Sequence, residues 1–222
     1  MENILDQIAV CVERGKVNVQ SPHPADMKGM DGTDELTKKA LDSGVVPGDI
    51  LSKALIEGMQ VVGQQFRNNE IYLPDVLMAA KAMTASMEYL RPYFQSGEVK
   101  HKGKVIIGTV AGDLHDIGKK IVSMFFEGGG WDVIDLGVDV NFDKYLQAIK
   151  EHHPYAVGLS ALLTTTMINM ETITSEIKAK YPDVKVMVGG APLTKEYAER
   201  IGADMYSPDP QGALEYLNAD TK

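Results

Sequence analysis

The sequence predicts an α/β protein in which an N-terminal four-helix bundle precedes a doubly wound parallel sheet. In residues 1–95, apolar side chains recur at the three- and four-residue spacing of amphipathic helices. From residue 105 on, short β-branched runs alternate with helical patterns, which is typical of a parallel sheet covered by helices on both faces. We therefore expect one domain at 1–95 and another at 105–222, joined by a polar, glycine-punctuated linker at 96–104.

Four helices are expected in the first half. The first runs from about residue 4 to 12, and the segment 15–33 reads as a loop because it is rich in proline and glycine. A second helix is expected from Thr33. A third is expected from Pro47 and a fourth from Pro74, since proline suits a first helical turn. The expected inner positions of the last two helices are Ile50, Leu51, Ala54, Leu55, Gly58, Met59, Val62, Val76, Leu77, Ala80, Met83, Met87 and Leu90.

The second half alternates between strands and helices. Its alternation predicts a doubly wound sheet of the Rossmann-like or flavodoxin-like type. The expected strands are 105–110, 132–136, 156–160, 185–189 and 204–206. The expected helices are 118–127, 142–152, 168–180 and 194–201, with a last one from 211.

Composition restricts the class of protein. The 222 residues carry a net charge of -9 and a pI near 5.0, which argues against nucleic acid as a partner. No apolar run approaches the ~20 residues that a membrane helix needs, and the N-terminal residues lack a signal-peptide pattern. Cys11 is the single cysteine, so no internal disulfide can form. We expect a cytoplasmic protein without membrane or nucleic-acid partners.

The most informative motif is Asp113-Leu114-His115-Asp116-Ile117-Gly118, directly after the first expected strand. In a doubly wound fold, ligands bind at the carboxyl ends of the strands. The carboxylate of Asp113 is close enough in sequence to accept a ring proton from His115, which would leave the other ring nitrogen free to bind a metal. With one cysteine and the next histidines at the far end of a helix, most other metal ligands would have to come from a cofactor.

A phosphate-binding loop is the competing interpretation of this glycine-flanked stretch. That motif needs two glycines separated by four residues, then lysine and a hydroxyl residue. Here Gly112 and Gly118 are separated by five residues, and Lys119 is followed by Lys120. Two aspartates in the loop would also repel phosphate, so the sequence excludes this motif.

The Asp-x-His-x-x-Gly motif, followed by Ser160-Ala161-Leu162 and by Gly189-Gly190, resembles the cobalamin-binding domains of the methionine-synthase type. The segment 63–75 is similar to the helical cap domain of those proteins. The resemblance covers nearly the whole chain except the loop at 15–33. In length and domain content, the chain is similar to the corrinoid proteins of methanol, methylamine and betaine methyltransferase systems.

This resemblance implies a role for each matching residue. His115 would be the metal ligand on the lower face of the cobalamin, with Asp113 and Thr166 completing a relay behind it. Ser160, Thr164 and the glycine pair would line the slot for the displaced nucleotide tail, while Phe66 and Leu73 would shield the upper corrin face. The cofactor-binding set implied in this way is Gly112, Asp113, Leu114, His115, Asp116, Gly118, Ser160, Leu162, Thr164, Gly189, Gly190, Phe66 and Leu73.

The resemblance also implies a function. The chain would carry a methyl group, with methylcobalamin as the loaded state, from a substrate:corrinoid methyltransferase to a methylcorrinoid:acceptor methyltransferase that uses tetrahydrofolate or a thiol. A reductive activation protein would be a third partner. Two alternatives remain at this stage: the small subunit of a carbon-skeleton mutase, against which the helical cap argues, and a corrinoid-dependent sensor, for which no signalling domain is evident.

Overall fold

The computed structural model describes residues 3–219 and divides into two compact units. The described part of Met1–His101 forms the first unit together with Gly128–Gly130. The second contains Lys102–Glu127 and the described chain from Trp131 onward. Two residues of the expected domain at 1–95 and three of that at 105–222 lie outside the described residues.

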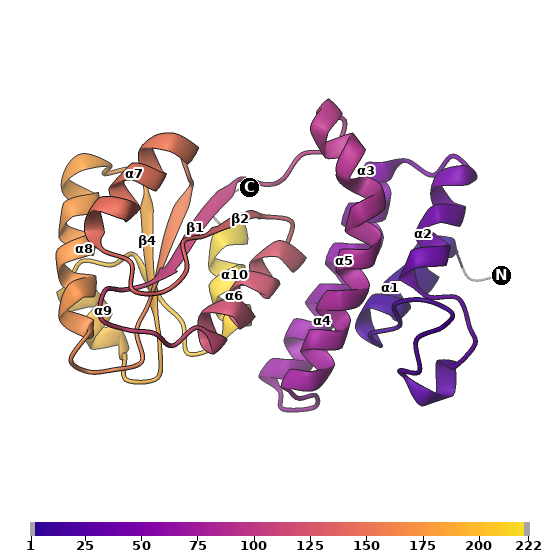
Figure 1. Cartoon of the computed structure of the whole chain (residues 1–222), viewed down its shortest axis with the longest axis horizontal. Coiled ribbons are helices and arrows are strands. Elements are labelled where there is room, and N and C mark those ends of the chain that lie inside the picture. The colour runs from indigo at the N-terminus through magenta and orange to yellow at the C-terminus, as the bar shows by residue number, and fades with distance from the viewer. Residues whose placement is uncertain (1–2, 220–222) are drawn as a thin grey trace. The chain divides into compact units, whose positions relative to one another are not determined.

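The first unit is helical, as predicted (Figure 1). The helix expected from Pro47 is continuous but contains a π-helical segment, η2, between two α-helical parts. The elements are α1 (Ile4–Glu13), η1 (Ala25–Met27), α2 (Thr33–Asp42), α3 (Pro47–Ile50), η2 (Leu51–Leu55), α4 (Ile56–Arg67) and α5 (Leu73–Ser96). Among residues 3–219, no helix has both the length and the apolar character needed to cross a membrane.

Apolar side chains between the helices form the core of this unit. Its buried members include Ile8, Val12, Ile50, Leu55, Met59, Val62, Val76, Met83 and Leu90. The predicted inner position Leu77 is wrong, because this side chain is 43% exposed. Val76 and Met83 are seven residues apart and lie on one buried stripe, whereas Leu77 is turned about 100° away from Val76.

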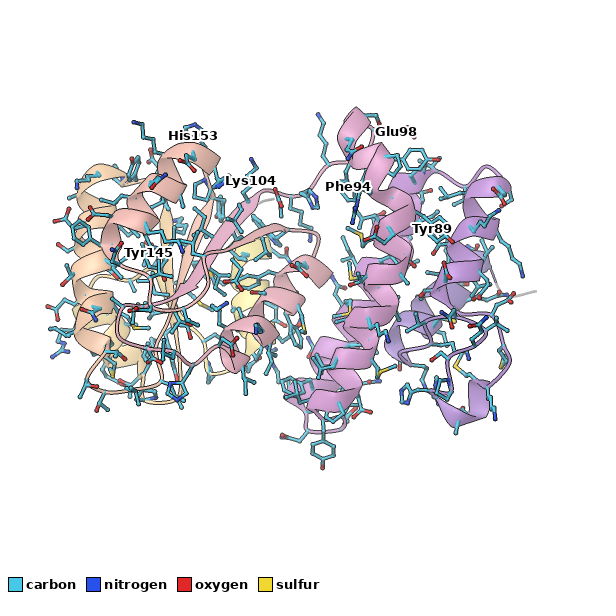
Figure 2. All side chains as sticks on the ribbon, viewed as in Figure 1. Tyr89, Phe94, Glu98, Lys104, Tyr145 and His153 are labelled. Carbon is cyan, nitrogen blue, oxygen red and sulfur yellow. The ribbon has the colours of Figure 1, made fainter. Side chains whose placement is uncertain are left out.

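Polar side chains tie α2 to α5 within the same unit. The hydroxyls of Thr37 and Ser86 lie 2.7 Å apart, and both residues are buried. Tyr89, labelled on α5 in Figure 2, donates a hydrogen bond of 2.7 Å to Oδ1 of Asp34 on α2. These bonds satisfy polar groups that would otherwise be costly inside a helical bundle.

In the described part of the chain, the second unit contains a parallel sheet of five strands in the order β2-β1-β3-β4-β5. The strands and helices agree with the predicted ones to within one or two residues at their ends. The strands are β1 (Lys104–Thr109), β2 (Asp132–Asp135), β3 (Ala156–Ser160), β4 (Lys185–Gly189) and β5 (Met205–Tyr206). The helices are α6 (Ile117–Gly128), α7 (Phe142–His152), α8 (Met167–Lys180), α9 (Lys195–Arg200) and α10 (Pro210–Ala219).

Helices cover both faces of this sheet (Figure 1). On β1, Ile106 belongs to the core that α7, α8 and α9 close, while Val105 and Ile107 belong to the core that α6 and α10 close. Both faces are therefore apolar, which explains why the strand sequences are continuous hydrophobic runs.

The strand order places a topological switch point between β1 and β3. The chain leaves β1 toward α6 on one face of the sheet and leaves β3 toward α8 on the other. The two strands are in register at their carboxyl ends, where Thr109 pairs with Ser160 and Ser160 pairs with Gly189 of β4. Diverging loops at such a point open the crevice in which doubly wound folds bind ligands.

Candidate functional site

Asp113 lies at the centre of the switch point and is completely buried. Its Oδ1 atom accepts a hydrogen bond from the backbone N–H of His115 (3.1 Å) and lies 2.7 Å from Nδ1 of the same residue. Its Oδ2 atom accepts from the N–H groups of Leu162 (2.8 Å) and Leu163 (3.2 Å) in the loop after β3. The carboxylate therefore joins the two loops that diverge at the crevice.

These donors keep Asp113 ionised. Burial alone would raise the pKa of this carboxyl, but hydrogen bonds from Leu162, His115 and Thr166 outweigh burial and hold the pKa well below its usual range. An ionised carboxylate only accepts hydrogen bonds, so Nδ1 of His115 must carry the proton. In the neutral imidazole the Nε2 atom then has a free lone pair, which is the form that binds metals.

Thr166 completes the relay. Its Oγ1 atom lies 2.8 Å from Oδ2 of Asp113 and 2.9 Å from the carbonyl oxygen of Leu163. The single hydroxyl proton favours the carboxylate, because a charged acceptor makes the stronger bond. Thr166 occupies the position before α8, where a threonine usually caps the helix, but its side chain makes no capping bond. Its hydroxyl faces Asp113 instead.

The loops and helix ends at this edge of the sheet carry exposed side chains. The side chain of His115 is 52% exposed, although its carboxylate partner is buried. Exposed apolar groups contributed by the same loops and by the first turns of α6 and α8 are Leu114, Ile117, Leu162, Leu163 and Ile168. Clustered exposed apolar residues mark binding surfaces, so this edge of the sheet fits a large ligand with apolar surface.

The two glycines at the end of β4 differ in what they require. Gly190 has a φ of 140°, and a Cβ atom there would lie 1.8 Å from the carbonyl oxygen of Ala161, so only glycine fits. A Cβ at Gly189 would meet nothing within 4 Å. Gly189 therefore borders open space beside Ser160, its partner in the sheet.

The remaining predicted residues of this unit also lie at the carboxyl edge of the sheet. Gly118 is in the first turn of α6, where an added Cβ would meet nothing within 4 Å. Thr164 is exposed in the turn before α8. Asp116 forms an ion pair with Lys120 one turn along α6, so its carboxylate has a partner within the protein. Gly112 adopts a φ of 80° immediately before Asp113.

Phe66 and Leu73 belong to the helical unit. Phe66 lies at the end of α4 and Leu73 begins α5, on either side of the short connection 68–72. Both side chains are partly buried. Their place over a corrin ring stays a prediction.

Sequence reasoning missed three residues that hold the site together. The N–H of Leu163 bonds to Asp113, Oδ1 of Asp139 accepts from the N–H of Gly112 (2.7 Å), and Nδ2 of Asn169 donates to the carbonyl oxygen of Ala111 (2.7 Å). Asp139 had a usable signal, because a polar residue after β2 lies at the same edge of the sheet as the histidine loop. Asn169 and Leu163 had none, since their partners are 58 and 50 residues away.

The donor set fits a cofactor that brings its own metal. Among the described residues, no cluster of three or more histidine, cysteine, aspartate or glutamate side chains could hold a metal ion. His115 offers one nitrogen, exposed apolar side chains lie on the same loops and helix ends, and open space borders Gly118 and Gly189. A metal already held in a large ring needs only such an axial ligand and such a surface.

Comparisons with known proteins agree with this fit. The family described as the B12 binding domain matches residues 103–215, and a second one of the same description matches residues 30–91. Trimethylamine corrinoid protein 2 of Methanosarcina mazei is 41% identical over 85% of this chain and 88% of its own length. Dimethylamine corrinoid protein 1 of Methanosarcina acetivorans is also 41% identical, over 76% of this chain and 80% of its own.

Solved structures give the same result. A chain of the methanol:cobalamin methyltransferase complex MtaBC from Methanosarcina barkeri matches with a TM-score of 0.82 and 28% identity, over 98% of this chain and 79% of that one. A cobalamin-binding protein from Desulfitobacterium hafniense DCB-2 matches with a TM-score of 0.74 and 28% identity, over 97% of both chains.

The switch point between β1 and β3, the histidine with its buried carboxylate and these comparisons together define a cobalamin-binding protein. Within that class, the chain belongs to the family of corrinoid proteins of methyltransferase systems. Cobalamin is its cofactor, and its general role is that of a methyl carrier.

Proposed function

We propose that this chain carries methyl groups between two partner enzymes of a methylamine-type system. A substrate:corrinoid methyltransferase loads it, and a methylcorrinoid:acceptor methyltransferase unloads it onto tetrahydrofolate or a thiol such as coenzyme M. The trimethylamine and dimethylamine corrinoid proteins among its relatives support methylamines as the donor class. The observation that carries the proposal is the half-exposed His115, whose Nδ1 is bound to the buried carboxylate of Asp113.

Bound cobalamin supplies a cobalt atom that can take up and release a methyl group. His115 would hold this cobalt through Nε2, while Asp113 keeps the ring proton on Nδ1 and Thr166 fixes the carboxylate. The open space at Gly189 and the neighbouring Ser160 and Thr164 would accommodate the nucleotide tail. Gly112, Leu114, Asp116, Gly118, Leu162 and Gly190 would shape the surface under the ring, and Phe66 and Leu73 would exclude water from its other face.

We also propose a third partner protein and a cellular compartment. A reductive activation protein would restore the metal when it leaves its working oxidation state by accident. The cytoplasm would be the compartment, and the single, buried and unpaired cysteine, Cys11, fits a reducing environment.

The axial ligand is tested by electron paramagnetic resonance of the cobalt(II) form. Protein labelled with ¹⁵N-histidine and reconstituted with unlabelled cobalamin should show a two-line nitrogen splitting from the imidazole. His115→Ala should abolish this pattern, while His153→Ala, a surface control at the end of α7, should keep it. A two-line pattern that survives in His115→Ala would show that His115 is not the ligand.

The carrier role is tested by transfer assays with purified partner enzymes. The loaded protein should pass its methyl group to tetrahydrofolate or to coenzyme M, and trimethylamine, dimethylamine, methylamine and methanol should be compared as donors. We expect at least one methylamine to load the wild type. Loading by methanol alone would contradict the methylamine assignment.

A further inference from the structure

The relay works only if the turn that carries Asp113 is held in place. Gly112 has a left-handed conformation, and the N–H of Asp113 closes a tight turn onto the carbonyl oxygen of Val110 (3.1 Å). A glycine in such a turn is conformationally free, so neighbouring groups must fix it. A small rotation of this backbone would move Oδ1 of Asp113 away from Nδ1 of His115.

Asp139, in the loop between β2 and α7, holds this turn at two points. Its Oδ1 atom accepts from the N–H of Gly112 (2.7 Å), and its own N–H donates to the carbonyl oxygen of Asp113 (3.0 Å). One residue thus binds the backbone on both sides of the peptide that joins Gly112 to Asp113.

The backbone of Asp139 is itself strained. Its φ of 53° lies in the left-handed region, which a residue other than glycine rarely adopts and which aspartate and asparagine tolerate best. Strained residues cluster at functional sites, where the surrounding structure over-determines them. Asp139 is exposed and contributes nothing to the core, so burial does not explain this conformation.

We propose that Asp139 is a positioning residue for the axial histidine: its carboxylate and N–H fix the Gly112–Asp113 turn, which sets the proton on Nδ1 and the direction of Nε2 of His115. This inference rests on the proposed function, since it assigns Asp139 to the support of the same ligand. Asn169 of α8 supports the same segment, because its Nδ2 atom donates a hydrogen bond to the carbonyl oxygen of Ala111, the residue before Gly112.

Three substitutions separate the hydrogen bond from the strain. Asp139→Ala removes the acceptor and keeps the strain, and Asp139→Gly removes the acceptor and the strain together. Asp139→Asn keeps an acceptor oxygen and tolerates the same φ. Asp183→Ala is the control for the loss of one negative charge. Asp183 lies in the exposed turn between α8 and β4, at the edge of the sheet opposite to the site.

The first measurement uses the protein without cofactor. Long-range ¹H–¹⁵N spectra of the imidazole should show the proton on Nδ1 of His115 in the wild type, Asp139→Asn and Asp183→Ala. Asp139→Ala and Asp139→Gly should show a mixture of the two tautomers. The second measurement is cobalamin affinity, which should fall about 10-fold in the Ala and Gly variants, the lower end of the range for partners of a metal ligand.

Wild-type tautomer and affinity in Asp139→Gly would overturn the proposal, because the acceptor would then be dispensable. Asp139→Asn behaving like Asp139→Ala would overturn it too, since charge rather than a hydrogen bond would then matter. If Asp139→Ala fails to fold, Asp139→Gly still decides, because it carries no strain. If His115→Ala keeps the two-line nitrogen splitting, the proposed function fails. The tautomer spectra still test the role of Asp139, because they are recorded on the protein without cofactor.

Discussion

At the scale of single residues, the site depends on one buried carboxylate with five hydrogen-bond contacts to its two oxygens. Asp113 is inaccessible, while the imidazole it holds is half exposed. The protein thus keeps the charge inside, where its donors are fixed, and exposes only the imidazole at the surface. Such buried partners usually tune the ligand they hold.

Asp113→Asn should destabilise the protein by about 2 kcal/mol or more at pH 7, because an amide group would face N–H donors and leave buried groups unsatisfied. The pKa of Asp113 is depressed in the folded state, so its contribution is complete above the ordinary aspartate pKa near 3.9 and is lost as pH falls through the folded value. The difference in unfolding free energy between wild type and Asp113→Asn should therefore be constant from pH 7 to 5 and shrink below about pH 4.

Urea unfolding of both proteins across this pH range measures the difference, and acid-sensitive groups that do not contact residue 113 cancel because both chains share them. Repeating the pair in a His115→Ala background removes the imidazole that contacts Asp113. A difference that is as large at pH 3 as at pH 7 would show that Asp113 is not held ionised by its donors.

At the scale of elements, two adjacent glycines at the end of β4 have different surroundings. Gly190 makes a close approach to the loop after β3, and Gly189 leaves space beside it. The two glycines are adjacent in sequence but face different constraints. We therefore expect Gly190 to matter for stability and Gly189 for the proposed nucleotide-tail slot.

Gly190→Ala should lower the melting temperature strongly, because its Cβ would overlap with the carbonyl oxygen of Ala161 and its φ of 140° disfavours any side chain. Gly189→Ala should leave the melting temperature of the cofactor-free protein nearly unchanged but weaken cobalamin binding, since the methyl group enters the open space. Calorimetry and cofactor titration measure the two effects. Unchanged cobalamin affinity in Gly189→Ala would remove Gly189 from the tail-binding slot.

At the scale of the whole molecule, the connection between the two units is more ordered than a flexible linker. Val99 is buried and its N–H donates to the carbonyl oxygen of Tyr93, while His101 stacks on Phe94 with ring centroids 4.2 Å apart. On the other side, the carbonyl oxygen of Gly103 accepts from the N–H of Asp132 (2.9 Å). Within the predicted linker, the segment up to His101 is thus tied to the first unit, and Gly103 is tied to the second.

Phe94→Ala should release the segment 97–101 and speed tryptic cleavage after Lys100 and Lys102 by about 2- to 10-fold, the range expected from losing one aromatic stack. Tyr89→Phe, which removes a hydroxyl from the same helix without touching the linker, is the control. Mass spectrometry of the early fragments locates the cuts. Equal cleavage rates in all three proteins would show that the stack does not order the linker.

The sequence by itself determined the elements and the central pair of the site. Helix and strand patterns are local, so they predicted both units, the strands to within a residue or two, and the pairing of His115 with Asp113 two residues away. The family resemblance implied that Thr166 lies behind Asp113, and its Oγ1 atom lies 2.8 Å from Oδ2 of that carboxylate.

Only the tertiary structure decided which distant groups meet. Leu163, Asp139 and Asn169 reach the histidine loop because the parallel sheet aligns the ends of β1, β2 and β3 at one edge. The contrast between Gly189 and Gly190 likewise depends on how closely another loop approaches each Cα atom. Periodicity reports which face of an element is apolar, but contacts between residues 27 to 58 positions apart depend on strand order and register, which no local pattern encodes.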